Sequence, residues 1–305
     1  MFAVNLCSYD TINSEIIDIN KDGVVKFTDY QQRVCWLYFN EVFNGVSSEA
    51  KFNSMKSNLK SFIDGKTVCI LTHGSTGSGK SCTMFGFGNE VGILHQSVSE
   101  ILKCGTIVLT VFEIIDKDRF DLIVNDGIKI RMTNDSKPNT KQIQSSDEFS
   151  QTFQQVLALR AQKSTDQNAT SSRSHLIVKI SLKNNSNCIV FADLAGFESA
   201  KNKENLSETQ FINSSLSGFN QVMLSMSRNE KPNFKANTLT KCLQPFINAN
   251  AVMFYHVNAY SMKTSLEMIK DIMASQKGQK RLKPQASSQP NKIQPMSNNG
   301  TLTQL

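Results

Sequence analysis

The sequence predicts an α/β protein in which helices cover both faces of a mixed central β-sheet. The first observation is that apolar runs of strand length alternate with segments whose apolar residues recur at helical spacing. The second is a glycine-rich loop at residues 74–81 that separates an apolar run from a helix start. At 305 residues the chain is long enough for one large domain with a well-buried core.

Taken in order, the apolar runs and periodic segments give six strands and six helices. The strands are expected at 3–7, 67–72, 106–115, 175–183, 187–193 and 251–258. The helices are expected at 80–85, 91–103, 147–162, 206–228, 237–248 and 263–275. In the helix at 206–228 the apolar residues recur every three or four positions, at Ile212, Leu216, Phe219, Met223 and Met226. That stripe predicts core packing and leaves the other helix faces free for a partner.

Two of the strands are expected to pair as an antiparallel hairpin. In the strand at 175–183, the apolar residues Leu176, Val178, Ile180 and Leu182 recur at every second position and so point to one face. The asparagines and serine at 184–187, which separate it from the strand at 187–193, are turn-forming residues. The hairpin would bring the polar segment before the first strand beside the polar segment after the second.

The glycine-rich loop reads Gly-Ser-Thr-Gly-Ser-Gly-Lys-Ser, which completes the G-x-x-x-x-G-K-[ST] pattern of a phosphate-binding loop. Its glycines let backbone N–H groups converge on phosphate oxygens, and the start of the next helix adds positive character. Lys80 supplies a charge for the β- and γ-phosphates, and the Ser81 hydroxyl can ligate Mg²⁺. We therefore predict a nucleoside triphosphate site made by Gly74, Ser75, Thr76, Gly77, Ser78, Gly79, Lys80 and Ser81.

A second polar segment follows the strand at 187–193 and reads Asp193-Leu-Ala-Gly-Phe-Glu198. Asp193, at the strand end, can hold Mg²⁺ through water. Gly196 can offer its N–H to the γ-phosphate without a steric conflict. An ordinary strand end with a turn is the alternative for this segment on its own.

The third segment, residues 168–175, reads Asn-Ala-Thr-Ser-Ser-Arg-Ser-His and precedes the strand at 175–183. Its hydroxyls at Ser171 and Ser172 can reach the waters of the metal and the attacking water. Arg173 and Glu198 carry opposite charges and can close an ion pair when both segments are drawn in. Alone, this segment could be an exposed polar loop, but the order of the three segments favours a nucleotide sensor.

These motifs resemble those of the kinesin motor domain. Residues 168–175 are similar to the N-x-x-S-S-R-S-H switch I of that family, and 193–198 to its D-L-A-G-S-E switch II, with Phe197 where Ser is usual. Residues 208–217 are close to its relay-helix sequence. The resemblance runs from about residue 39 to about residue 275.

The resemblance implies an ATPase that couples Mg-ATP hydrolysis to cyclic binding and movement on microtubules of the cytoplasm or the spindle. Asn168 and Ser171 would then position the attacking water. Mg²⁺ would bind Ser81 directly and Ser172 and Asp193 through waters. A non-motile microtubule-binding or regulatory protein with weak ATP turnover is the alternative. An NTPase that has the same phosphate-binding loop but another partner, such as nucleic acid, also remains open.

The resemblance also implies a track-binding face after switch II. Basic residues that would face the acidic microtubule there are Lys201, Lys203, Arg228, Lys231, Lys235 and Lys241. A solvated basic surface is the alternative. The run at 235–240 departs from the R-D-S-K-L-T run of the family and loses one basic and one acidic position.

Two further departures concern adenine. Kinesins usually open with an R-x-R-P element that cradles the base, but residues 1–12 contain neither Arg nor Pro. Cys82 stands where an aromatic residue or His is common. We therefore expect the base to add little to nucleotide affinity.

Composition sets the remaining expectations. No apolar run approaches the length of a membrane span, so we expect no membrane partner. The seven cysteines form no C-x-x-C pair, so we expect no zinc site, and reduced thiols that act as small apolar residues.

The net charge of +7 comes largely from residues 276–305, which are basic, polar and without acidic residues. We assign 1–275 to the motor domain and 276–305 to a disordered tail. The tail suits an acidic partner or a solvated linker equally, nucleic acid is not the favoured partner, and no heptad pattern predicts a coiled coil for self-dimerisation.

Overall fold

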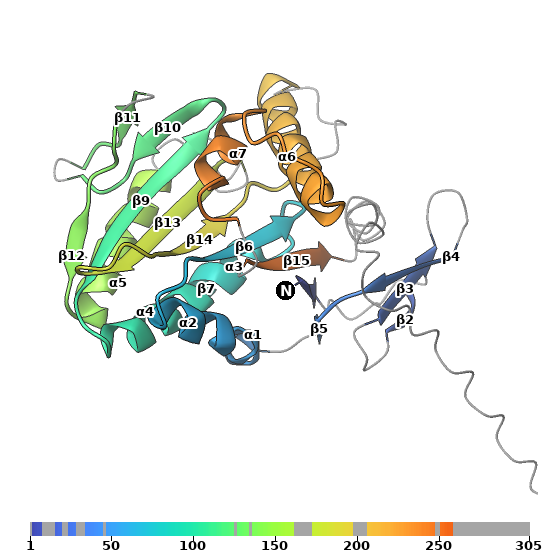
Figure 1. The fold of residues 1–305 in the computed structure, drawn as a ribbon, viewed down its shortest axis with the longest axis horizontal. Coiled ribbons are helices and arrows are strands. Elements are labelled where there is room, and N and C mark those ends of the chain that lie inside the picture. Colours follow the sequence, from blue (N-terminus) through green and yellow to red (C-terminus); the bar gives the residue numbers. More distant parts are fainter. Residues whose placement is uncertain are drawn as a thin grey trace, which may run out of the picture.

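A computed structural model describes residues 2–7, 16–19, 24–28, 34–44, 47–124, 127–133, 136–161, 173–197, 206–247 and 251–258. These residues form a ten-stranded mixed sheet with helices on both faces (Figure 1), as the sequence predicts. The predicted helix at 263–275 and the tail at 276–305 lie outside the described residues.

The sheet has the strand order β11-β10-β9-β13-β14-β6-β15-β1-β5, with β12 also paired to β9. Its strands are β1 (Phe2–Cys7), β5 (Glu41–Asn44), β6 (Val68–Gly74), β9 (Ile107–Ile115), β10 (Asp118–Asp121), β11 (Ile130–Met132), β12 (Lys141–Ile143), β13 (His175–Leu182), β14 (Ile189–Asp193) and β15 (Val252–Asn258). All six predicted strands are among them. The half from β14 to β5 is parallel, and the half from β11 to β14 is antiparallel.

The predicted hairpin is confirmed. Strands β13 and β14 pair antiparallel, with Leu176 opposite Asp193 and Ile180 opposite Ile189. The turn uses Asn184 at a φ of 77°, a left-handed conformation that asparagine tolerates better than most residues. The start of β13 therefore lies beside the end of β14.

The central strand β6 lies between β14 and β15 and is parallel to both. In this register Thr72 pairs with Asp193, and Gly74 pairs with His256. Because the carboxyl ends of parallel strands meet at one edge, the loop after β6 and the segment after β14 leave the sheet together.

Alternating side chains of the strands supply two separate cores. Val68 and Ile70 pack with the helices of one face, whereas Cys69 and Leu71 pack with those of the other. The first face carries α1 (Ser48–Ser54), α2 (Lys56–Ile63), α3 (Lys80–Phe85), α4 (Ile93–Leu102) and α5 (Ser146–Ala161). The second carries α6 (Leu206–Ser227) and α7 (Thr238–Leu243).

The apolar stripe of α6 packs into the second core as predicted, from Ile212 to the partly buried Met226. The prediction of a helix over 237–248 was wrong in length, because α7 ends at Leu243. Pro245 lacks the backbone N–H that a longer helix needs. At its start, α7 has a capping box in which the Asn237 side chain accepts from the Thr240 N–H at 2.9 Å.

Several short elements have no counterpart among the predicted ones. A separate sheet is made by β2 (Ile16–Ile19), β3 (Val24–Thr28) and β4 (Val34–Tyr38), and a small hairpin by β7 (Gly86–Phe87) and β8 (Glu90–Val91). Among the described residues, no helix is both long and apolar enough to cross a bilayer. Cys69 and Cys188 are buried free thiols, whereas Cys82 and Cys104 are exposed free thiols.

Candidate functional site

The predicted phosphate loop forms a closed turn at the carboxyl end of β6. Gly77 and Gly79 have φ angles of 73° and 83°, which residues with a Cβ rarely adopt. The Lys80 Nζ donates to the Ser75 carbonyl at 2.7 Å, and the Ser78 hydroxyl donates to the same oxygen at 2.8 Å. Because α3 has only six residues, the amides of the loop and the Lys80 charge contribute more to anion binding than its helix dipole.

Ser81 and Asp193 meet beside this loop. The Ser81 hydroxyl donates to Asp193 Oδ2 at 2.7 Å, and the Thr72 hydroxyl donates to Oδ1 at 3.0 Å. Asp193 is only 1% exposed, so its carboxylate is fixed in place. A hydroxyl and a carboxylate oxygen at this spacing are the donors that Mg²⁺ prefers, and the pair therefore fits a magnesium ion.

The segment after Asp193 runs along the phosphate loop. Phe197 forms an isolated parallel bridge with Ser75. A Cβ on Gly196 would lie 2.6 Å from the backbone nitrogen of Thr76, so only glycine allows this approach. The structure thus brings both Gly196 and Asp193 into contact with the same loop.

Arg160, in the last turn of α5, joins this site although no motif contains it. Its Nη1 donates to Asp193 Oδ2 at 3.2 Å, and its Nη2 donates to the Ser174 carbonyl at 3.0 Å. The side chain is 3% exposed. A buried arginine in a predicted helix gives no sign of its partners in the sequence, because they come from strands that only the fold brings near.

His175, the last residue of the third motif, connects the site to α6. Its Nδ1 accepts from the Ala195 N–H at 3.0 Å, so its Nε2–H donates to the Ser215 hydroxyl at 2.9 Å. That hydroxyl in turn donates to the Ile212 carbonyl at 2.8 Å. Burial lowers the pKa of His175 to about 3, which keeps the imidazole neutral in this network.

His73 makes a second connection to α6, from the end of β6. Its Nε2 lies 3.0 Å from the Asn220 side-chain oxygen. Its ring contacts those of Phe197 and Phe219 at centroid distances of 6.3 and 6.0 Å. Burial lowers the pKa of His73 to about 4. The sequence offered no signal for this residue beyond its place before the loop.

The structure describes only some of the other residues predicted for the site and for the track-binding face. Arg173 is half-buried just before β13. Arg228, Lys231, Lys235 and Lys241 are all exposed, along the segment from the end of α6 to α7. The remaining predicted residues lie outside the described ones: Asn168, Ser171, Ser172, Glu198, Lys201 and Lys203.

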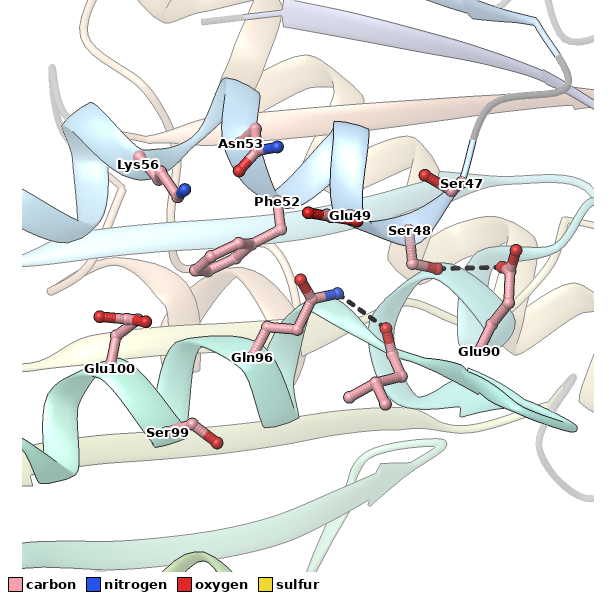
Figure 2. A pocket seen from close by; sticks show the side chains of 11 residues that line it. Ser47, Ser48, Glu49, Phe52, Asn53, Lys56, Glu90, Gln96, Ser99 and Glu100 are labelled. Atoms are coloured by element: carbon pink, nitrogen blue, oxygen red, sulfur yellow. Dashed lines mark hydrogen bonds between the residues drawn. The ribbon is translucent and has the colours of Figure 1, made fainter.

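Two hollows lie away from the phosphate loop. One, of about 590 Å³, lies between α1, β8 and α4, where Ser48 donates to Glu90 and Gln96 to the Val91 carbonyl (Figure 2). The other, of about 480 Å³, lies between α6 and the chain that leads to α7, and Lys231 is on its rim. No predicted phosphate or magnesium residue lines either hollow.

A family model described as the kinesin motor domain matches residues 10–270. The chain belongs to the kinesin motor domain family. The predicted resemblance to this family is confirmed.

Relatives of known name agree with this assignment. The chain is 29% identical over 253 residues to the protein claret segregational of Drosophila melanogaster, which covers 73% of the chain and 36% of that protein. It is 30% identical over 258 residues to the kinesin-like protein KIN-14C of Oryza sativa subsp. japonica, which covers 72% of the chain and 27% of the relative. The chain thus spans about a third or less of the length of these kinesin relatives.

Solved kinesin structures share the fold. A KIF14 dimer with AMP-PNP in complex with a microtubule gives a TM-score of 0.74 at 18% identity and covers 90% of this chain and 93% of that one. The motor domain of the Kar3-like kinesin from Ashbya gossypii gives a TM-score of 0.68 at 20% identity and covers 90% and 98%.

Proposed function

We propose that this kinesin motor domain is a microtubule motor ATPase, which couples Mg-ATP hydrolysis to cyclic binding and movement on microtubules. The observation that carries the proposal is the meeting of the phosphate loop and switch II at one sheet edge. There, Ser81 and Asp193 share a hydrogen bond of 2.7 Å beside the phosphate loop, and Gly196 packs against Thr76. Switch II therefore lies where the binding or loss of a γ-phosphate would move it.

In this proposal the residues act mainly by positioning and by charge. Lys80 and the loop amides hold the phosphates, and Ser81 holds the magnesium ion directly. Asp193 and Ser172 hold it through waters. Bound magnesium supplies positive charge against the phosphate oxygens. Asn168 and Ser171 orient the attacking water, and an Arg173–Glu198 ion pair marks the closed state.

The coupling step follows from contacts between switch II and α6. Gly196 senses the γ-phosphate through its N–H, so its segment shifts when that phosphate leaves. The neighbouring Ala195 is hydrogen-bonded to His175, which contacts Ser215 of α6. A displacement of switch II is thereby passed to the helix that precedes the basic segment.

The partner is inferred from charge. The exposed residues Arg228, Lys231, Lys235 and Lys241 would meet the acidic microtubule surface, together with Lys201 and Lys203. The KIF14 motor domain of the same fold, in complex with a microtubule, supports this partner class. Such contacts between exposed charges weaken as salt rises.

The test measures ATP turnover and microtubule co-sedimentation with the full chain. We expect microtubules to raise turnover several-fold. Neutralising the four described basic residues to glutamine is expected to reduce co-sedimentation at low salt. A matched control neutralises four exposed lysines elsewhere, at positions 60, 66, 103 and 183, and is expected to bind as the wild type does.

Co-sedimentation without stimulation of turnover would instead identify a non-motile microtubule-binding protein. Turnover that is unaffected by microtubules, with no co-sedimentation, would identify an NTPase with another partner. Either result contradicts the proposal. Equal loss of binding in the two glutamine variants would contradict the assigned face.

A further inference from the structure

The side chain of His256, in β15, lies directly against the phosphate loop. Its Nδ1 is 3.1 Å from the Ser78 carbonyl oxygen. Both residues are 0% exposed, so the contact is closed to solvent. At the backbone, His256 pairs with Gly74, where a Cβ would collide with the His256 carbonyl oxygen. Strand β15 therefore contacts the loop at its first residue and again at Ser78.

The contact with Ser78 identifies which imidazole nitrogen carries the proton. A carbonyl oxygen can only accept a hydrogen bond, so the Nδ1–H of His256 is the donor. Burial lowers the pKa of His256 to about 3, and the positive charges of Lys80 and Lys51 act in the same direction, as does His73. The imidazole is therefore neutral near pH 7, and its single N–H is directed at the loop.

The direction of the Ser78 carbonyl decides the direction of the next amide. The Ser78 C=O and the Gly79 N–H belong to one peptide unit, and in a trans peptide the two groups point in opposite directions. Among the described residues, no peptide bond is cis. Because the carbonyl points at β15, the Gly79 N–H points away from that strand. An N–H so directed from a phosphate loop can donate to a phosphate oxygen.

A second carbonyl of the loop is held in a different way. The Ser75 carbonyl accepts from the Lys80 ammonium at 2.7 Å and from the Ser78 hydroxyl at 2.8 Å. A bound phosphate competes with that carbonyl for Lys80, so this contact changes when nucleotide binds. The neutral imidazole of His256 lies on the strand side of the loop, and its hold on Ser78 is the same with and without nucleotide.

We propose that His256 is a positioning residue for the phosphates of ATP and ADP, because its Nδ1–H holds the Ser78 carbonyl against β15 and so aims the Gly79 N–H at a bound phosphate. The inference rests on the proposed function, in which the loop binds these phosphates. When the donor is removed, the buried Ser78 carbonyl loses a hydrogen bond, and its peptide unit rotates toward another donor. The Gly79 N–H then turns away from the phosphate.

The experiment compares His256→Leu with His256→Asn, two side chains that branch alike at Cγ and leave the same space. Only asparagine carries an N–H donor on a nitrogen bonded to Cγ, where Nδ1 of histidine also lies. The measurements are the Kd values of ADP and of a non-hydrolysed fluorescent ATP analogue for the full chain, and the kcat and KM of ATP turnover.

We expect H256L to raise both Kd values and KM by about tenfold, because one hydrogen bond to a charged phosphate is weakened. It should leave kcat within about twofold of the wild type, since the lost contact serves the substrate and the transition state equally. H256N is expected to bind both nucleotides within about threefold of the wild type, because the donor is kept. A matched control is H95L, which removes a histidine of α4 that packs on the Phe149 and Phe153 rings, and it should leave both Kd values unchanged.

The tautomer of His256 gives a second measurement, which decides even if H256L folds poorly. Long-range ¹H–¹⁵N NMR spectra of the histidine side chains at pH 7 should show His256 as the Nδ1–H tautomer, with its signals assigned through H256N. His175, whose Nδ1 accepts from the Ala195 N–H, should appear in the same spectrum as the Nε2–H tautomer.

Equal nucleotide affinities of H256L and H256N would overturn the inference and leave the proposed function intact. So would the Nε2–H tautomer at His256, or a loss in H256L that falls on kcat while both Kd values stay unchanged. A wild-type chain that binds neither ATP nor ADP would overturn the proposed function and this inference together.

Discussion

Lys80 is buried within its own loop, where its ammonium donates to the Ser75 carbonyl. The charge is therefore already placed where the β- and γ-phosphates would bind. Replacing Lys80 with alanine is expected to reduce ATP turnover by about 100-fold or more, because the phosphates lose their main compensating charge. Steady-state turnover checks this, with Lys103→Ala as the control. Turnover near the wild-type rate would refute the assignment of the loop.

Base selectivity is a second property of single residues. Cys82, which follows Ser81 in α3, is exposed and offers a poor surface for stacking adenine. We expect discrimination between ATP and GTP of no more than about 1–3 kcal/mol, which packing contacts alone can supply. Competition binding of the two nucleotides to the full chain measures it. A preference for ATP of about ten-thousandfold or more would require hydrogen bonds to adenine from other residues.

Residues of the site differ in how far the sequence could predict them. Ser81 and Asp193 were predicted because their chemistry requires fixed neighbours in the chain, and the structure places them together. Arg160 and His73 act through partners that are distant in the sequence, at Asp193 and Asn220. A sequence motif specifies residues that are close together in the chain and does not identify partners that are far apart. Only the fold could identify these pairs.

Between elements, β6 and α6 are joined by the partly buried contact of His73 with Asn220. Replacing Asn220 with alanine removes the partner of a buried imidazole nitrogen, which is expected to lower the free energy of unfolding by about 1–3 kcal/mol. On the proposed function it also lowers the microtubule stimulation of turnover without changing ATP affinity.

Denaturant titration and microtubule-stimulated turnover check this expectation. The exposed neighbour Gln221 gives the control, since Gln221→Ala should change the free energy of unfolding by about 0.5 kcal/mol or less. Equal effects of the two substitutions would mean that the contact does not join the elements.

Elements with long apolar runs were predicted well, and short ones were not. Strands β6 and β9 are buried almost throughout and read as apolar runs. By contrast, β10 has the sequence Asp-Arg-Phe-Asp, and β12 has three residues that begin with Lys141. Both form because β9 offers them a pairing edge, so their stability comes from the sheet and not from their own composition.

Across the whole molecule, the stability should depend on pH through the buried histidines. Burial lowers the pKa values of His73, His175 and His256 from 6.5 to about 4, 3 and 3. Below about pH 6.5 the unfolded chain therefore binds protons that the folded chain does not. Each histidine then lowers the free energy of unfolding by roughly 1.4 kcal/mol per pH unit, down to its own folded pKa.

Denaturant unfolding between about pH 6 and about pH 5 measures this slope. His73→Gln removes one of the three groups, so we expect its slope to be shallower by roughly 1.4 kcal/mol per pH unit. Comparing slopes cancels the titration of the carboxylates, which both proteins share. An unchanged slope would mean that His73 is protonated in the folded state.

The position of β6 between β14 and β15 also has a consequence for the order in which the protein is made. The phosphate loop is synthesised before the two strands that flank its parent strand are complete, at residues 193 and 258. Until the last described strand has been synthesised, β6 keeps an open, apolar edge that can pair with other chains. Until then that edge is exposed to aggregation, and nucleotide cannot assist folding around the loop before residue 258 has been synthesised.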